Sequence, residues 1–315
     1  EAEYSPELTG AFPDTLAMIA VEHERMVNCS DNQRQWLPPL VVRDALSESD
    51  WLLWGTLNRY LPVLAEAAPT AFLDALERLL TESPDTIKQL YAHEGTGFGG
   101  RNFLTGILWG LEHLAWSDEH IGRVTLALGS LDSLDPGGNW ANRAKQSLVK
   151  TYLPWHPQTV AKLEKKLGLL EALAKRYPQT GWDVLVALLP GQTRTTSGNH
   201  KPEWQDFAPS EDKPVKSSAF WEEVNAYTSL LLNEAERYPE KIAILSQHLA
   251  DLPPAAFDRA ATMLEAFAKD KEDSEELQFE VWKKLKPLAR KHRRYATTDW
   301  AMGEERLQVV ERLAS

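Results

Sequence analysis

Residues 160–178 read VAKLEKKLGLLEALAKRYP. Apolar residues recur in this segment at spacings of three and four from Val160 to Ala174, which is the pattern of an amphipathic helix. Pro178 then stops the helix and also suits the first turn of another helix. The segment therefore predicts one helix that is followed at once by a second.

The same helical period runs through nearly the whole chain. No run of six residues alternates strictly between apolar and polar side chains, so strands have no competing signal. The predicted fold class is therefore all-α. Besides the segment above, we expect helices near residues 13–28, 48–67, 69–82, 84–93, 102–116, 118–134, 140–151, 179–189, 217–237, 239–251, 254–269, 273–295 and 303–314.

Several neighbouring helices share a proline at their junction. Arg176-Tyr177-Pro178 recurs 61 residues later as Arg237-Tyr238-Pro239, and looser versions surround Pro69 and Ser117. Each junction predicts a tight helical hairpin. The spacing is longer and less even than the ~34 residues of regular tetratricopeptide (TPR) repeats. We therefore expect a degenerate TPR/HEAT-like solenoid of helical hairpins, wound into a right-handed superhelix.

A long insertion interrupts these hairpins and divides the chain into three parts. We expect a helical-repeat block with a tryptophan-rich core at 1–190, an insertion loop at 191–218 and a second helical-repeat block at 219–315. Loops of this length are commonly functional or disordered. The functional alternative assigns partner binding to Arg194, His200, Lys201 and Trp204. The other alternative is a disordered spacer with Trp204 packed into the core.

The functional alternative carries a prediction about stability. If the loop only binds a partner, replacing residues 192–200 by a Gly/Ser linker abolishes binding and leaves the melting temperature nearly unchanged.

Composition limits the kind of partner and the compartment. The 315 residues carry 46 acidic and 34 basic side chains, a formal charge of −12, which argues against general binding to nucleic acid. The single cysteine, Cys29, indicates a reducing compartment, so we expect a cytoplasmic protein. No apolar run reaches the ~18 residues of a membrane span, and no leader is evident. We expect the chain to be a piece of something longer.

The sequence contains no group of residues that predicts catalysis. Residues 95–100 match the letters of a dinucleotide fingerprint, but a helix instead of a strand precedes them, so we interpret them as a turn. No phosphate-binding loop occurs, and no two histidines lie four residues apart as zinc ligands would. We interpret Glu112-His113 as a solvated helix face. No catalytic residue, cofactor or metal is expected, and an active site dispersed over distant residues is the enzymatic alternative.

The 12 tryptophans and a polar turn supply further candidates for binding. Large rings could fill the gaps between hairpins, or a subset could line a binding face as anchors. In the turn at residues 135–143, Asn139 could cap a helix that starts at Trp140, or Asn142 and Arg143 could offer hydrogen bonds to a partner. Both alternatives stay open at this stage.

A basic run lies near the end of the chain. Residues 283–294 hold seven Lys or Arg, and the apolar spacing of Leu285, Leu288 and Ala289 turns the basic side chains toward solvent. We expect Lys283, Lys284, Arg290 and Arg293 to pair with the acidic run at 270–276 or with an acidic surface of a protein partner. DNA binding is the alternative.

Five segments in order resemble a known group of proteins. Over roughly residues 40–210, the chain is similar to the C-terminal helical-repeat regions of bacterial signal-transducing STAND NTPases, notably the antiviral group. The segments that carry the resemblance are residues 104–116, 135–143, 153–159, 181–190 and 200–204.

The resemblance implies a sensor. In that family the repeats bind phage structural or packaging proteins and trigger oligomerisation, while nucleotide-binding and effector modules precede them. This chain lacks the phosphate loop and any effector motif, so only the recognition role is implied for it. The alternatives are an all-helical enzyme and a structural scaffold or oligomerisation segment.

Overall fold

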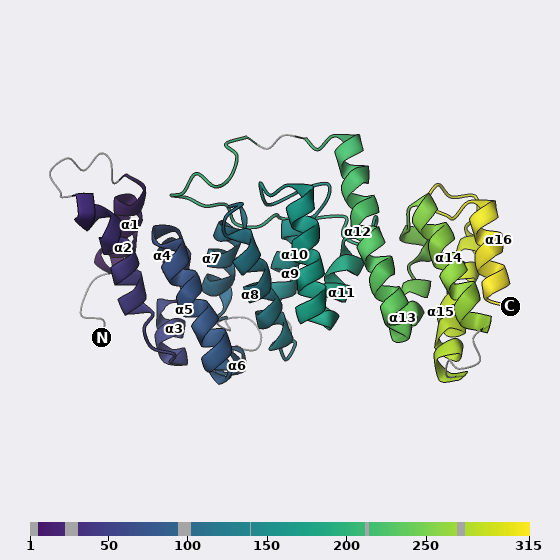
Figure 1. Cartoon of the computed structure of the whole chain (residues 1–315), viewed down its shortest axis with the longest axis horizontal. Helices are drawn as coiled ribbons and strands as arrows, with labels where there is room; N and C mark the ends of the chain where they lie inside the picture. Colours follow the sequence, from purple (N-terminus) through teal and green to yellow (C-terminus); the bar gives the residue numbers. More distant parts are fainter. Residues whose placement is uncertain (1–5, 23–30, 94–101, 139, 212–213, 270–274) are drawn as a thin grey trace. The chain divides into compact units, whose positions relative to one another are not determined.

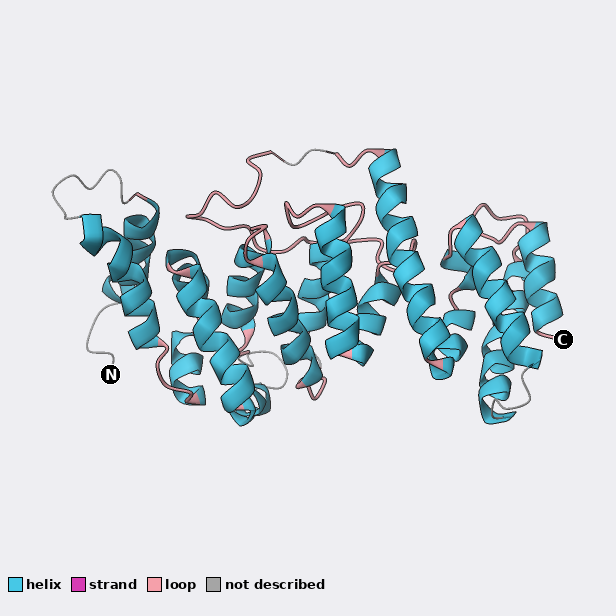
Figure 2. Cartoon of the chain, viewed as in Figure 1, coloured by secondary structure: helices cyan, strands magenta, loops and turns pink. Residues whose placement is uncertain are grey.

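The computed structural model in Figures 1 and 2 describes residues 6–22, 31–93, 102–138, 140–211, 214–269 and 275–315. Within these ranges there are sixteen α-helices, one 3-10 helix and no strand, so the predicted all-α class is confirmed. None of the helices in the described ranges is long and apolar enough to cross a membrane. The predicted turn at 95–100, Cys29, Asn139 and residues 270–274 lie outside the described residues.

Two compact units share the chain. Unit 1 comprises residues 1–184 and 196–215, and unit 2 comprises residues 185–195 and 216–315. The expected division was into two blocks separated by a loop at 191–218. In the structure most of that loop belongs to unit 1, because its contacts are made there.

Unit 1 is built from short helices that pack on near neighbours in the sequence. Helix α4 packs against α1 and α7, and α5 packs against α2 and α8, which in turn contacts α9 and α10. The rings of Trp54, Trp116, Trp182, Tyr152 and Phe72 are almost completely buried in it. Its helices are α1 (Pro6–Val21), α2 (Asp31–Ala45), α3 (Trp51–Leu57), α4 (Leu61–Ala67), α5 (Pro69–Glu82), α6 (Pro84–Ala92), α7 (Thr105–Ala115), α8 (Ile121–Ser133), α9 (Ala144–Tyr152), α10 (Leu163–Arg176) and the first part of α11 (Pro178–Ala187).

Unit 2 has its own core. Helix α13 packs against α12 and α15, and α16 packs against α14 and α15. Buried side chains of Tyr227, Leu231, Phe257, Leu285 and Leu307 fill the space between these helices. Its helices are α12 (Ser217–Arg237), α13 (Pro239–Ser246), the 3-10 helix η2 (Leu249–Asp251), α14 (Pro254–Lys269), α15 (Glu275–Arg294) and α16 (Glu304–Leu313).

The predicted proline junctions are confirmed. Helices α5, α6, α11 and α13 all begin at a proline. The residue before each proline leaves the helical region, with φ between −131° and −150° and ψ between 52° and 96°. This follows from the clash between the proline ring and the preceding residue, which disfavours helical backbone there. The chain therefore changes direction within one residue at each junction.

Several helix predictions were wrong at particular residues, among them the helix expected at 13–28, which is α1 at Pro6–Val21, and the helix expected at 239–251, which ends at Ser246 before η2. Helix α2 was missed, because it contains Pro38 and Pro39, and the sequence rule ends a helix at proline. The expected helix 48–67 is two helices, because Pro62 has no N–H to continue the ladder. Helix α9 starts at Ala144 and not at Trp140, with extended Arg143 as its N-cap residue.

Candidate functional site

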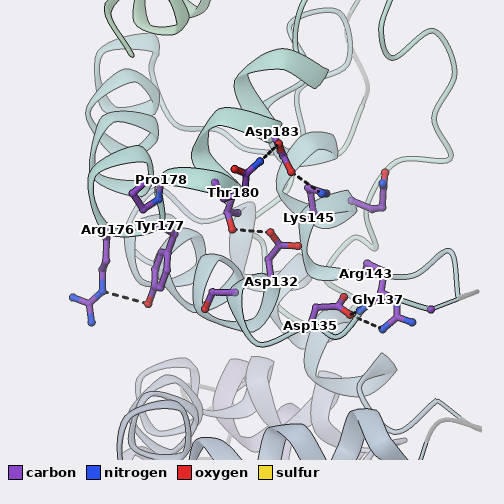
Figure 3. Close-up of a pocket in the computed structure, with 14 residues that line it drawn as sticks. Asp132, Asp135, Gly137, Arg143, Lys145, Arg176, Tyr177, Pro178, Thr180 and Asp183 are labelled. Carbon is purple, nitrogen blue, oxygen red and sulfur yellow. Dashed lines mark hydrogen bonds and ion pairs between the residues drawn. The ribbon is translucent and has the colours of Figure 1, made fainter. Parts of the chain in front are cut away.

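A polar cavity of about 570 Å³ opens on unit 1. Its walls come from the end of α8, the turn after it, the start of α9 and the junction between α10 and α11 (Figure 3). The turn is possible because Gly137 and Gly138 take φ of 80° and 150°, which other residues rarely adopt. The volume is in the range of ligand-binding pockets.

Two ion pairs line this cavity, one within the turn after α8 and one between α9 and α11. Arg143 Nη1 lies 3.1 Å from Asp135 Oδ1, which also accepts the Gly137 N–H at 2.7 Å. Lys145 Nζ lies 2.9 Å from Asp183 Oδ2 (Figure 3). Three acidic and three basic side chains line the cavity, so their formal charges cancel. The acidic ones are Asp132, Asp135 and Asp183, and the basic ones are Arg143, Lys145 and Arg176.

Asp132 is a cavity carboxyl group whose pKa differs from its ordinary value. Burial raises the pKa of Asp132 above its ordinary value, and the charges of Asp135 and Asp183 add to the rise. The hydroxyl of Thr180 donates to Asp132 Oδ2 at 2.7 Å, and this hydrogen bond lowers the pKa of Asp132 by part of that rise. For Lys145, burial alone would lower the pKa, but the hydrogen bond to Asp183 outweighs it and raises the pKa.

The arrangement suits binding. The charges paired within the turn and between α9 and α11 form a fixed pattern of donors and acceptors, into which polar side chains of a ligand can fit. Arg176 stands at the exposed rim, with its Nε 3.3 Å from the Tyr177 hydroxyl. Among the described residues, no group of three or more His, Cys, Asp or Glu side chains is placed to hold a metal ion.

A second hollow of about 530 Å³ on unit 1 is lined largely by aromatic and proline rings. Trp116, Trp155 and Pro157 contribute to it, together with Val160 and Pro209. Trp155 is 38% exposed, whereas Trp54 and Trp182 are buried in the core. The tryptophans therefore divide between the two roles that the sequence left open, packing and exposure on a face.

The insertion contains an extended segment that crosses unit 1, which we call the strap (residues 196–207). Figure 1 shows the chain after α11 running back as far as α4 before it returns to α12. The strap turns onto unit 1 at Gly198, whose φ is 74°. A Cβ at this position would lie 3.0 Å from Gln158 Oε1. Two buried glutamates, Glu66 and Glu112, hold the strap in place.

Glu112 lies in α7 and is 1% exposed. Its Oε2 accepts the backbone N–H of His200 at 3.0 Å and lies 2.6 Å from His200 Nδ1, while Oε1 accepts the Ser147 hydroxyl at 2.6 Å. Burial alone would raise the pKa of Glu112, but these hydrogen bonds outweigh it and lower the pKa. The Trp116 indole adds a hydrogen bond of 3.1 Å to the carbonyl oxygen of His200.

Glu66 lies in α4 and is fully buried. Its two carboxylate oxygens accept the backbone N–H groups of Glu203, Trp204 and Gln205 at 3.0, 2.7 and 2.8 Å. His113 Nδ1 lies 2.7 Å from Oε1, a close polar contact without good hydrogen-bond direction. Burial would raise the pKa of Glu66, but the contacts with His113 and the three N–H groups lower it.

These contacts correct one interpretation from the sequence and change one expectation. Glu112 and His113 are buried and not a solvated helix face, because the strap covers them. In contrast to the prediction from the sequence, the contacts lead us to expect a lower melting temperature when residues 192–200 are replaced. That replacement would remove the His200 imidazole from Glu112 and the Asn199 side-chain amide from Thr151.

The predicted binding residues of the insertion lie in different environments. Arg194 is exposed in unit 2, and its Nε donates to the carbonyl oxygen of Gly191. In the strap, the His200 ring lies 4.2 Å from the Trp109 ring, and the Lys201 ammonium lies 5.3 Å from the Trp116 ring. Trp204 is half-buried. Arg143 lines the polar cavity, and half-buried Asn142 directly precedes it.

The basic run on α15 lies in unit 2. Leu285 and Ala289 are buried and Lys283, Lys284, Arg290 and Arg293 are exposed, as the helical spacing predicts. Arg293 is held by two carboxylates of α16, Glu304 at 2.8 Å and Glu311 at 2.6 Å. Its acidic partners therefore come from α16, whereas most of the expected acidic run lies outside the described residues.

Sequence reasoning missed the residues that organise both features. Asp132, Lys145 and Asp183 gave no signal, because they come from three helices that only the fold brings together. Glu66 and Glu112 did give one, since each is a lone carboxylate within an apolar helical run. A charged residue on an apolar face indicates a buried partner.

No protein-family model, curated protein or solved structure matches the chain. The function is therefore argued from the geometry of unit 1 and from the residues themselves.

Proposed function

We propose that the chain is a protein-recognition module of helical repeats. It would serve as the sensor part of a larger bacterial antiphage NTPase and bind a phage protein. The observation that carries the proposal is the polar cavity on unit 1, where Arg143–Asp135 and Lys145–Asp183 hold charged groups in a fixed pattern. Such a pattern gives specificity for a charged protein surface, because a mismatched partner leaves charges unpaired.

The proposal includes a finer statement about the fold. The helices would form a degenerate TPR/HEAT-like solenoid of hairpins with a right-handed superhelix. The proline junctions support this, as do contacts between helices three apart in the chain, α4 with α7 and α5 with α8. In a repeat array each hairpin covers its apolar face with the next one.

The identity of the larger protein rests on the resemblance of residues 40–210 to the repeat regions of antiviral STAND NTPases. In this proposal nucleotide hydrolysis, effector activity and oligomerisation belong to parts outside this chain, and a phage structural or packaging protein is the partner. The hollow at Trp155 supports a protein partner, since exposed aromatic rings are common anchors at interfaces.

Immobilised chain and lysates of phage-infected and uninfected cells test the proposal. We expect a protein from the infected lysate to be retained. Arg176→Ala, at the exposed rim of the cavity, should reduce retention at least about tenfold, the effect of a modest interface hot spot. Lys175→Ala is the matched control, exposed on the same helix and outside the cavity lining. Retention of no protein, or equal loss in both variants, would contradict the proposal.

The raised pKa of Asp132 favours a second candidate, an all-helical enzyme. A cavity carboxyl group whose pKa is raised is a candidate general acid. The two candidates differ in what happens to a captured partner. If the chain only recognises its partner, mass spectrometry should find the captured partner chemically unchanged. If the chain is an enzyme, the partner should be altered after capture by wild type and unaltered after capture by Asp132→Asn.

A further inference from the structure

The strap crosses three helices of unit 1 in the reverse of their order in the chain. Asn199 binds the Thr151 hydroxyl at 2.9 Å on α9, and His200 binds Glu112 on α7. Residues 203–205 then bind Glu66 on α4. One polar side chain from each successive helix thus receives successive residues of an extended segment.

Most of these hydrogen bonds go to the backbone of the strap. The N–H groups of Asn199, His200, Glu203, Trp204 and Gln205 all donate to side chains of unit 1. Side chains that receive backbone N–H groups recognise an extended chain almost independently of its sequence. Specificity comes from a few side chains, in the strap from Asn199 and His200.

The two carboxylates define which occupant fits. Both are buried with lowered pKa, so both are charged at neutral pH and need donors. An occupant must therefore offer free backbone N–H groups next to Glu66. A histidine or other cationic side chain next to Glu112 forms a charge-assisted hydrogen bond.

Polar contacts hold the strap on unit 1 more than burial of its own side chains does. The side chains of His200, Lys201 and Glu203 are exposed, and Trp204 is only half-buried. Release of the strap therefore costs chiefly these hydrogen bonds, which another extended chain could replace. Segments of this kind belong to the low-stability end of a structure.

We propose that the surface formed by Glu66, Glu112, Trp116, Thr151 and Gln158 is a peptide-binding surface that the strap occupies in the absence of a partner. The ligand is an extended segment of a protein partner that carries a histidine or basic side chain, and it displaces the strap. The inference rests on the proposed recognition function and assigns a surface to it.

A labelled peptide of residues 196–207 tests this surface. The receptor is the full chain with residues 198–205 replaced by a Gly/Ser linker of equal length that carries proline at positions 200 and 203–205, so that these positions offer no backbone N–H to Glu112 or Glu66. The peptide should bind this variant at least about tenfold more tightly than it binds wild type, whose surface is occupied. Binding should fall at least about tenfold when the linker variant also carries Glu112→Gln. The same loss should follow N-methylation of the peptide at Trp204 and Gln205, which removes two donors to Glu66.

Hydrogen exchange in the wild-type chain provides a second test, which does not depend on folding of the linker variant. The amide hydrogens of Trp204 and Gln205 should exchange at least about tenfold faster than that of buried Leu111 in α7, because the strap opens without global unfolding. Equal exchange rates would make the strap a permanent part of unit 1 and overturn the inference. Failure of the peptide to bind a folded linker variant would also overturn it.

Further outcomes separate this inference from the proposed function. If a captured partner stays bound in excess peptide, the recognition role stands and the surface assignment falls. If the peptide binds but no partner is captured from the lysates, the surface assignment stands and the recognition role falls. If wild type forms a dimer in which each chain's strap occupies the surface of the other chain, the occupant is a second copy of this chain, and the inference is overturned.

Discussion

Two buried glutamates hold the insertion on unit 1. Each would be costly in isolation, because burial strips water from a carboxylate. The cost is offset by donors from the strap, three N–H groups at Glu66 and one N–H with an imidazole at Glu112. Since both pKa values lie below the usual 4.5, folding favours the charged forms. Their contribution to stability is complete above pH 4.5 and declines as the pH falls below it.

Glu112→Gln tests this linkage. At pH 7 the variant should lose about 2 kcal/mol in the free energy of unfolding, the value of a hydrogen bond to a charged group. The difference from wild type should shrink as the pH falls below 4.5, because the unfolded chain is protonated first and the folded wild type, with its lower pKa, is protonated last. Urea unfolding at several pH values measures both quantities. Glu164→Gln, at an exposed position on α10, is the control, and a difference that does not change with pH would contradict the account.

Single residues were the part of the site that the sequence predicted least well. Arg143 was selected from a polar turn and does line the cavity, but Asp132, Lys145 and Asp183 were missed. Their spacing in the chain has no pattern, because the cavity arises where α8, α9 and α11 meet. Glu66 and Glu112 were detectable as charges in apolar runs, although no sequence rule names their partner more than 80 residues away.

At the scale of the helices, the sequence was a better guide. Each residue before a junction proline leaves the helical region for a local steric reason, so Pro69, Pro84, Pro178 and Pro239 could be placed in advance. The same rule failed at Pro38 and Pro39 inside α2. There, packing of α2 against α5 and burial of Val42 stabilise a helix that local rules reject.

The α10–α11 junction allows a matched pair of glycine substitutions. A Cβ at Gly181 would lie 2.4 Å from the Ala174 Cα and 2.7 Å from its nitrogen, so the backbone must move. Gly181→Ala should therefore destabilise the protein by about 2 kcal/mol. A Cβ at exposed Gly168 on α10 meets nothing within 4 Å, so Gly168→Ala should stabilise by up to about 1 kcal/mol.

Thermal unfolding of the two variants measures the difference. A lower melting temperature for Gly181→Ala and a raised one for Gly168→Ala would agree with close contact between α10 and α11. Equal shifts in the same direction would show that helix propensity alone decides both positions.

For the whole molecule, charge separates the possible partners. The formal charge of −12 repels nucleic acid. The basic run on α15 could offset this repulsion only for phosphates within about a Debye length of it, ~8 Å at physiological salt. Part of that run is already neutralised. Arg293 pairs with Glu304 and Glu311, and Lys283 pairs with Glu280 at 3.0 Å. The exposed cations that remain are better suited to steering an acidic protein surface than to holding phosphates.

A gel-shift assay distinguishes these partners. At ~150 mM salt, the chain should leave the mobility of a duplex DNA unchanged, because its formal charge of −12 opposes the phosphate contacts that drive such binding. If the proposed partner is acidic, neutralising Lys283, Lys284, Arg290 and Arg293 together should slow its association at low salt and leave dissociation nearly unchanged. Arg293→Ala alone is the matched control, since its charge is already paired within unit 2. A DNA shift that disappears in the fourfold variant would instead assign the basic run to nucleic acid.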